Sequence, residues 1–304
     1  MSNRIGHGSD RAVLTFVAIT YALSLALSVV IGTTGGQASS LIGFGFLSMA
    51  FPTVAVLVVR AAFGERLGID WGRILWRYVP VALLLVPALM HAVMLPAAMV
   101  FEDGLHWQGW LTPESDGFYH VPPDRGWGIV TGPGLAGRIA INAAVGLALV
   151  SILALFEEVG WRAWLLPRLV GRLGARAGLT ATALIAAGWH MPYVFSGIHY
   201  LQGVDAGTTA VVMSVGQVGA GLIIGWLWLR TESIWIVALA HGALNNWGQY
   251  AFKYIQDFVS GADWLVLGVG NIALLVCGLV LTLAALPENR AGAVAVPASV
   301  ASHQ

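Results

Sequence analysis

Two adjacent carboxylates, Glu157 and Glu158, end an 18-residue apolar segment that covers residues 139–156. Ionisable side chains at the end of a membrane-length apolar run are costly, so they are retained mainly where they pair, line a wet cavity or take part in chemistry. On a helix, Glu158 and Arg162 are four residues apart and share a face, whereas Glu157 points about 100° away from them. The spacing predicts that Glu158 pairs with Arg162 while Glu157 stays free for a reaction.

Polar side chains also interrupt two later apolar segments. His190 lies in the middle of the first, two residues before Pro192. Because proline has no N–H to donate, we expect a bend that frees the carbonyl of Gly188 beside the histidine. In the second segment, His241 and Asn245 are four residues apart and therefore share a helix face.

Together these side chains form a set suited to hydrolysis. Glu157 with His190 would orient a water molecule and take its proton, and His241 with Asn245 would donate hydrogen bonds to the oxyanion on an attacked carbonyl. A histidine or protonated Glu157 would then give a proton to the leaving amine. The sequence has no HExxH, no GxSxG and no intramembrane Asp pair. The zincin, serine-hydrolase and aspartyl alternatives therefore lack their signatures.

The composition indicates that these residues lie in a membrane. Of the 304 residues, 58% are hydrophobic and only 10% are charged, and the mean hydropathy is +0.78. Several runs approach or exceed the roughly 20 apolar residues that span a bilayer as a helix. We therefore expect an all-α membrane protein, with one transmembrane domain over residues 12–286. Its eight helices are predicted at residues 12–32, 40–60, 78–101, 138–160, 178–198, 207–229, 233–252 and 264–286.

The distribution of basic residues predicts the orientation of the chain. Twelve of the 15 Arg and Lys residues fall on one side of the predicted spans. This positive-inside bias predicts a cytoplasmic N-terminus over residues 1–11 and a disordered cytoplasmic tail over residues 287–304. The net charge of zero gives no reason to expect nucleic acid as a partner, so the expected partners are the lipid bilayer and a membrane-associated peptide or protein substrate.

Three further expectations concern side chains and connections near the predicted membrane surfaces. The loop between the third and fourth spans, rich in Trp, Pro and Gly, could form a cap or an irregular connection, and an irregular connection is favoured. Trp161 and Trp164 are expected to anchor the chain at the cytoplasmic interface. His199 is expected at the opposite surface in a packing or interface role, and Cys277, the single cysteine, in an inert apolar position.

The motifs are similar to those of a known family. The run Glu157-Glu158-x-x-x-Arg162, continuing to Leu169, followed by His190 and then by His241-x-x-x-Asn245, resembles the CPBP family of intramembrane proteases. That family includes CAAX prenyl endopeptidases of the Rce1 type and bacterial proteins related to bacteriocin processing and self-immunity. The resemblance covers residues 139–248, and the EExxxR block is its most specific part.

The resemblance implies an Rce1-like bundle of eight transmembrane helices whose membrane-embedded active-site cavity opens toward the cytoplasm of a bacterial cell. By likeness, the catalytic residues are Glu157, His190, His241 and Asn245, and Glu158 with Arg162 organises the site. A metal-free glutamate mechanism fits the family better than a metalloprotease mechanism. Zinc stays open, and its ligands would be Glu157, His190 and His241.

The sequence departs from the family pattern at one position and is ambiguous at another. Where the family usually has Phe four residues before the second-motif histidine, this chain has Ala186, and Trp189 stands next to His190 instead. Asn245 is followed by Asn246, and the face shared with His241 favours Asn245 as the functional amide.

Two functions from other classes compete with an endopeptidase. A non-catalytic membrane binding or immunity protein could keep the same fold and use the polar site to recognise a partner. A transporter is less favoured, because the polar residues gather toward one side and no paired half-helices are evident.

Overall fold

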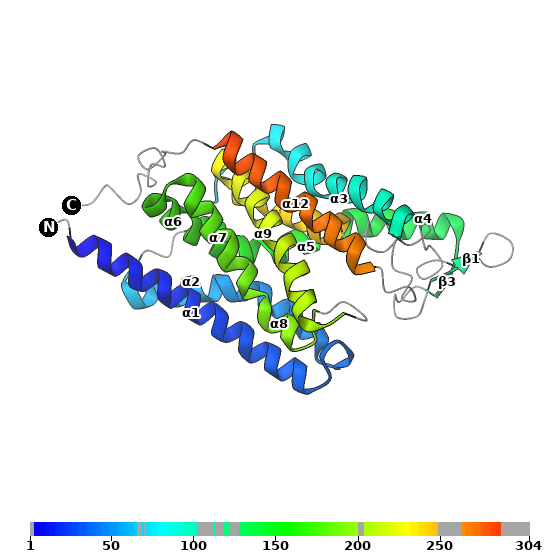
Figure 1. Cartoon of the computed structure of the whole chain (residues 1–304), viewed down its shortest axis with the longest axis horizontal. Helices are drawn as coiled ribbons and strands as arrows, with labels where there is room; N and C mark the ends of the chain where they lie inside the picture. Colours follow the sequence, from blue (N-terminus) through cyan, green and yellow to red (C-terminus); the bar gives the residue numbers. More distant parts are fainter. Residues whose placement is uncertain are drawn as a thin grey trace.

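The computed structural model describes residues 3–65, 69, 71–101, 112–113, 118–121, 128–199, 204–248 and 263–286. These residues form an elongated bundle of helices with a small antiparallel sheet at one end (Figure 1). The elements, in chain order, are α1 (Asn3–Thr33), η1 (Gly36–Ala38), η2 (Ile42–Ala50), α2 (Phe51–Phe63), η3 (Trp76–Tyr78), α3 (Val79–Phe101), β1 (Thr112–Pro113), β2 (Phe118–Val121), β3 (Gly128–Thr131), α4 (Gly132–Ile141), η7 (Asn142–Gly146), α5 (Leu147–Glu158), η8 (Val159–Leu165), α6 (Leu166–Leu173), α7 (Ala175–Trp189), α8 (Met191–Phe195), α9 (Ala206–Thr231), α10 (Ile234–Ala243), η9 (Leu244–Gly248) and α12 (Asp263–Ala285).

Helices occupy all eight ranges in which spans were predicted. Within the described residues, six are long and apolar enough to cross a membrane: Asp10–Thr33, Ile42–Phe63, Trp76–Phe101, Gly132–Leu173, Ala206–Thr231 and Trp264–Ala285. In the ranges 178–198 and 233–252 the helices are shorter, with 15 residues in α7 and 10 in α10. The structure is therefore nearly all-helical and has the features of a multi-pass membrane protein, with a candidate span in six of the eight predicted ranges.

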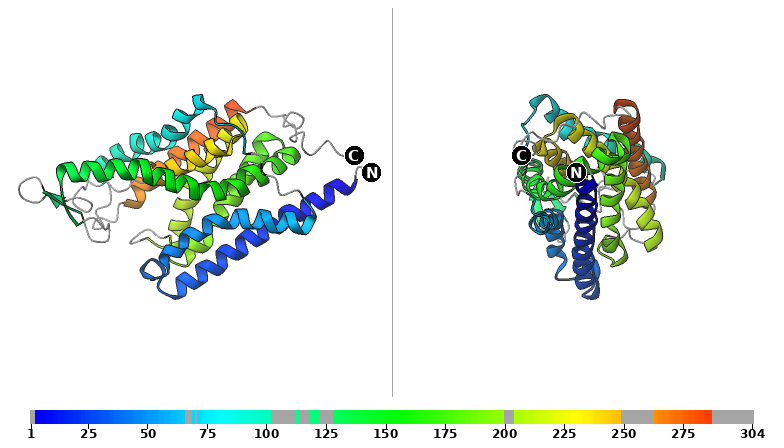
Figure 2. Two further views of the ribbon diagram at one scale, coloured as in Figure 1. Left: turned by 180° about the vertical axis from the view of Figure 1, so that it is seen from behind. Right: turned by 90° about the vertical axis from the view of Figure 1, so that its left-hand side faces the viewer.

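The fourth predicted span, residues 138–160, is part of a much longer helix. α4, η7, α5, η8 and α6 follow one another with helical backbone angles at every junction and cover 42 residues. At about 1.5 Å per residue this helix is roughly 60 Å long, twice the apolar thickness of a bilayer. It begins where the Thr131 hydroxyl accepts a hydrogen bond from the Gly134 N–H and ends before Gly174, whose φ of +81° stops the helix. The left panel of Figure 2 shows it running along the whole bundle.

The loop between the third and fourth spans was predicted to be irregular, but part of it forms a sheet. β1, β2 and β3 form a three-stranded antiparallel sheet in the order β1-β2-β3, with Phe118 opposite Thr131 and Val121 opposite Gly128. The sheet lies at the end of the bundle where α4 begins (Figure 1). Backbone hydrogen bonds between the strands stabilise this connection.

Trp161 and Trp164 are not interfacial anchors, which corrects the prediction from their position in the sequence. Their exposed fractions are 1% and 0%. The ring of Phe16 in α1 lies 5.5 Å from that of Trp161 and 4.8 Å from that of Trp164. Because the helix continues past residue 160 and α1 packs against it, both indoles lie in the core of the bundle.

The first and last helices of the bundle have their chain ends on the same side, as expected if the chain crosses the membrane an even number of times. The N-terminal end of α1, α6 and the C-terminal end of α12 lie at the same end, opposite the sheet (Figure 1). At this end Arg172 of α6 forms an ion pair with Asp10 of α1. Which side of the membrane this end faces stays a prediction from the distribution of basic residues. The predicted tail, residues 287–304, lies outside the described residues.

α9 and α12 approach so closely at Gly219 that a Cβ there would fall on the backbone of Leu274 and Leu275. Gly219→Ala should therefore destabilise the protein by about 1–3 kcal/mol, because the helices must separate. Gly268→Ala is the matched control, since a Cβ on that α12 glycine has no heavy atom within 4 Å. Thermal unfolding of both variants in detergent checks this, and equal stability of the two would contradict the packing.

Candidate active site

The predicted site residues come from three parts of the bundle. Glu157 and Glu158 end α5, and Arg162 lies in η8. His190 separates α7 from α8. His241 and Asn245 lie in the α10–η9 segment, which packs against α5. The helix containing the two glutamates therefore meets the third predicted motif directly.

The carboxylate of Glu158 joins two of the three parts. Its Oε1 accepts hydrogen bonds from the Arg162 guanidinium at 2.9 Å and from Nδ1 of His241 at 2.7 Å. Glu158 is fully buried, and the side chains of Arg162 and His241 are only 4% and 13% exposed. The ion pair expected between Glu158 and Arg162 is present. The bond to His241 could not be foreseen from spacing, because 83 residues separate the two partners.

Arg162 also ties the site to a fourth element. Its second terminal nitrogen donates a hydrogen bond to the carbonyl of Gly221 in α9 at 3.3 Å. The close approach needed for this contact is available because Gly221 has no side chain, and a Cβ there would lie 3.1 Å from that of Ala183 in α7. Glu158 Oε2 and Arg162 Nε have no hydrogen-bond partner within the described part of the chain.

Glu157 differs from its neighbour in having no formed hydrogen bond among the described residues. It is nevertheless buried, with an exposed fraction of 5%. Its carboxylate interacts electrostatically with His241, Glu158 and Arg162. The division expected from the sequence, one glutamate held in an ion pair and one left without a partner, is present in the structure.

His190 lies at a break in its helix, as the position of Pro192 predicted. α7 ends at Trp189, and α8 begins at Met191. The ring Nδ1 of His190 contacts the carbonyl of Ala186 at 3.0 Å, rather than the carbonyl of Gly188 that was expected to be free. A carbonyl can only accept a hydrogen bond, so Nδ1 carries the proton and Nε2 is left with its lone pair. His190 and His241 interact electrostatically.

The two adjacent asparagines have different surroundings. Asn246 is 9% exposed and donates a hydrogen bond to the Asn142 carbonyl in η7 at 3.4 Å. The half-buried Asn245 has no hydrogen-bond partner among the described residues. Asn246 thus bonds the neighbouring helix, whereas the amide of Asn245 is available for another partner.

His199 is exposed, as expected, but it is not remote from the site. Its ring lies 6.4 Å from that of His190, with the two planes 28° apart. The chain turns back after α8, because the N–H groups of Ile198 and His199 both bond to the carbonyl of Tyr193. This turn could not be predicted from a helical reading of residues 178–198.

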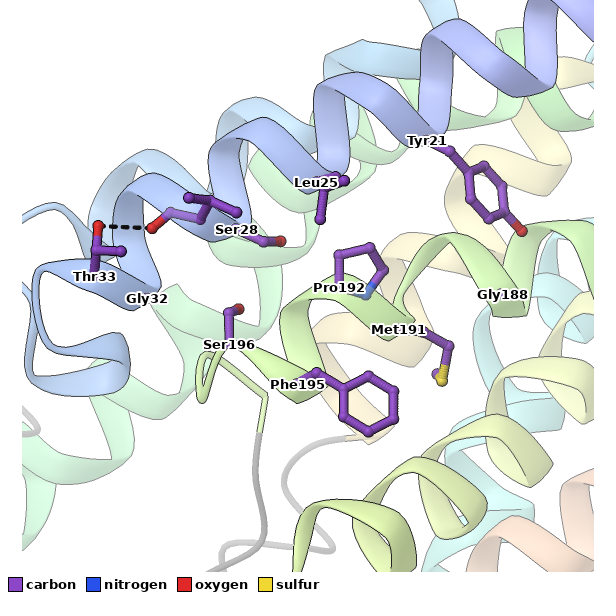
Figure 3. Close-up of a pocket in the computed structure, with 11 residues that line it drawn as sticks. Tyr21, Leu25, Ser28, Gly32, Thr33, Gly188, Met191, Pro192, Phe195 and Ser196 are labelled. Atoms are coloured by element: carbon purple, nitrogen blue, oxygen red, sulfur yellow. Dashed lines mark hydrogen bonds between the residues drawn. The ribbon is translucent and has the colours of Figure 1, made fainter.

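A cavity of about 720 Å³ lies between α1 and α8, beside the helix break (Figure 3). Tyr21, Leu25 and Ser28 line it from α1, and Met191 and Pro192 line it from α8. None of the predicted site residues is in its lining. The prediction of an active-site cavity that opens toward the cytoplasm is therefore not met by this cavity.

The three residues expected to bind zinc, if a metal is present, are not grouped as a ligand set. In the part of the chain that the structure describes, no three His, Cys, Asp or Glu side chains are placed together so that they could hold a metal ion. Among the described residues, hydrogen bonds join Glu158, Arg162 and His241, and electrostatic interactions connect Glu157 to these three and His190 to His241.

The fold and the buried polar cluster define a helical membrane protein with a carboxylate–histidine site. Residues 139–247 match the family model described as type II CAAX prenyl endopeptidase Rce1-like. This match supports the resemblance to CPBP proteases seen in the sequence, and it covers nearly the same residues. No curated protein matches the chain significantly.

The ion pair makes Glu158 essential to the stability of the cluster. Glu158→Gln keeps the shape of the side chain but leaves the buried guanidinium of Arg162 without its counter-ion, so it should destabilise the protein by about 3–5 kcal/mol. Asp10→Asn removes a pair in which Asp10 is 54% exposed and should cost about 1 kcal/mol or less. Equilibrium unfolding in detergent measures both, and similar losses would argue against a dominant role for the buried pair.

Proposed function

We propose that this protein is an intramembrane endopeptidase that hydrolyses a peptide bond of a membrane-associated substrate. The observation that carries the proposal is the position of Glu158, which binds Arg162 and His241 while the carboxylate of Glu157 beside it forms no well-aligned hydrogen bond among the described residues. The Rce1-like match supports the reaction class, because that family consists of proteases.

The charges of the cluster support a defined protonation state. Nδ1 of His241 donates to the Glu158 carboxylate, so an imidazolium ring would have that carboxylate as its counter-ion. Two carboxylates, one guanidinium and one imidazolium then sum to zero, which a buried cluster requires because unbalanced charge is costly there. In this state Nε2 of His241 also carries a proton and can donate it.

Two hydrogen-bond acceptors serve the water molecule. The carboxylate of Glu157 forms no well-aligned hydrogen bond among the described residues, so it can accept one from water, and Nε2 of His190 has a lone pair because Nδ1 donates to the carbonyl of Ala186. A water between them is oriented by both, and Glu157 takes one of its protons as the oxygen attacks the substrate carbonyl carbon.

Two hydrogen-bond donors serve the substrate oxygen. Nε2–H of His241 and the amide of Asn245 stabilise the oxyanion of the tetrahedral intermediate. The proton held by Glu157 is then transferred to the leaving nitrogen, the C–N bond breaks, and the products are a carboxyl group and an amine. Glu158 and Arg162 organise the site by holding His241 in place.

No step of this mechanism needs a metal ion. The side chains of Glu157, His190 and His241 are used here as base, acceptor and donor, and the proposal expects activity to survive a zinc chelator. Loss of cleavage on chelation, with recovery on adding Zn²⁺, would replace this mechanism with a metal-assisted one.

The substrate and orientation are also part of the proposal. A site among membrane-length helices restricts the enzyme to bilayer-associated substrates, and the family match suggests a CAAX-like peptide. The excess of basic residues at one side suggests that both termini face the cytoplasm of a bacterial cell, and that the site is open toward the same side.

Removing the proposed base should stop catalysis. Glu157→Gln in purified protein should lower kcat by about 100- to 10,000-fold, because the amide cannot take a proton from water. His190→Ala should also abolish cleavage. The measurement is cleavage, in liposomes, of a fluorophore–quencher peptide with a prenylated CAAX end, together with the membrane proteome of cells carrying wild type or Glu157→Gln.

Folding of these variants is checked by their thermal unfolding, and Gly268→Ala serves as an active control. Cleavage that survives Glu157→Gln would remove the mechanism. If wild type changes neither the reporter nor the proteome, and a cellular phenotype is unaffected by Glu157→Gln, a non-catalytic binding or immunity protein is the better account.

Substitution of Asn245 should affect mainly kcat, whereas substitution of Asn246 should affect mainly stability. Asn245→Ala should lower kcat by about 100- to 1,000-fold with little change in stability, because it removes an oxyanion donor. Asn246→Ala should lower the unfolding temperature and leave kcat nearly unchanged, because Asn246 bonds Asn142 instead. The reverse pattern would assign the functional amide to Asn246.

A further inference from the structure

Two buried tryptophans connect the residues that are proposed to activate water. Trp161 lies four residues after Glu157, and Trp189 directly precedes His190. The two indole rings are 5.9 Å apart in an edge-on arrangement, and the Trp189 ring lies 4.7 Å from that of His190 at 80°. Both indoles are only 1% exposed. They therefore form a continuous line of side chains from the base to the histidine.

The N–H groups of these indoles have no hydrogen-bond partner in the described residues. Leaving a buried donor unsatisfied costs about 1–3 kcal/mol, so each such group calls for an explanation. Other tryptophans of the protein do find partners: Trp164 donates to Glu65 at 3.2 Å, and Trp247 donates to the carbonyl of Ala143 at 3.0 Å. Trp226 also has an unpaired buried N–H, so what distinguishes Trp161 and Trp189 is their position beside Glu157 and His190.

The N–H of Trp161 has one acceptor within reach. The Glu157 carboxylate lies close enough to interact with it, although the two do not form a well-aligned hydrogen bond. Catalytic hydrogen bonds are often long or poorly aligned before substrate binds and become shorter in the complex. The unpaired donor and the unpaired carboxylate therefore complement each other.

The contact of Trp189 places an aromatic ring beside His190 even though this chain departs from the family pattern at Ala186. The family usually has Phe where this chain has Ala186, and the aromatic ring next to His190 comes instead from Trp189. Ala186 keeps a different contact, because its carbonyl accepts the hydrogen bond from His190 Nδ1. The ring of His190 thus contacts a backbone carbonyl and, in a T-shaped arrangement, the indole of Trp189.

We propose that Trp161 and Trp189 are positioning residues for the water-activating pair. The N–H of Trp161 fixes the Glu157 carboxylate on the side of the water, and the ring of Trp189 fixes the plane of His190. The contact between the two indoles keeps the distance between the Glu157 and His190 side chains constant. This inference rests on the proposed function for its effect on catalysis, while the contact between Trp161 and Glu157 can be tested without any substrate.

The first test compares Trp161→Phe with Trp164→Phe, two ring-retaining substitutions of fully buried tryptophans in η8. Only Trp161→Phe removes a donor beside Glu157, and it should lower kcat by about 10- to 100-fold with KM nearly unchanged. Trp164→Phe loses its bond to Glu65 and should affect only stability. Trp189→Leu should lower kcat, and Trp189→Phe, which keeps an aromatic ring beside His190, should recover most of it.

The second test uses infrared spectroscopy of the purified protein and needs no substrate. The carboxyl band that disappears in Glu157→Gln should shift in Trp161→Phe and stay in place in Trp164→Phe. A merely structural role for Trp161 would leave that band unmoved, and this result would overturn the inference. A shifted band in a protein that cleaves nothing would instead keep the positioning contact and remove the proposed function.

Discussion

The site depends on one buried carboxylate that is shared between an arginine and a histidine. Glu158 has no exposed surface, and its Oε1 binds both Arg162, four residues along the same helix, and His241 from α10. A charge at this depth is stable only if it is paired. The pairing therefore constrains the distance between α5 and α10. Since Arg162 also bonds the Gly221 carbonyl of α9, one charge network holds three helices together.

The segments η7, η8 and η9 are π-helical turns. In the described residues, η8 follows the two glutamates and contains Arg162, and η9 contains both asparagines. η7 supplies the Asn142 carbonyl to which Asn246 bonds. Wider turns of this kind are uncommon and often lie at functional sites, because they shift the faces that side chains occupy. Here η9 directs Asn246 toward Asn142 of the neighbouring helix, while Asn245 has no hydrogen-bond partner among the described residues.

The spacing of residues along the sequence predicted contacts within one helix, but it did not predict the hydrogen bond between helices. The Glu158–Arg162 pair and the break near Pro192 follow from four-residue periodicity and from the missing proline N–H. The bond from His241 to Glu158 joins residues 83 positions apart, so only the packing of α10 on α5 produces it. Trp161 was misassigned because its position near an arginine-rich end resembled an interface. The helix continues to residue 173, and α1 covers the indole.

The hydrogen-bond partners of the two histidines give a physical reason for the opposite roles that the proposed mechanism assigns to them. In each ring Nδ1 is already engaged, but the partners differ: His190 faces the neutral carbonyl of Ala186, whereas His241 faces the Glu158 carboxylate. A neutral acceptor gives no electrostatic reason for a second proton, so Nε2 of His190 remains an acceptor. A buried carboxylate favours an imidazolium, so Nε2 of His241 becomes a donor. In the proposed mechanism His190 would therefore serve the water and His241 the oxyanion, and the difference comes from the partner of Nδ1 in each ring.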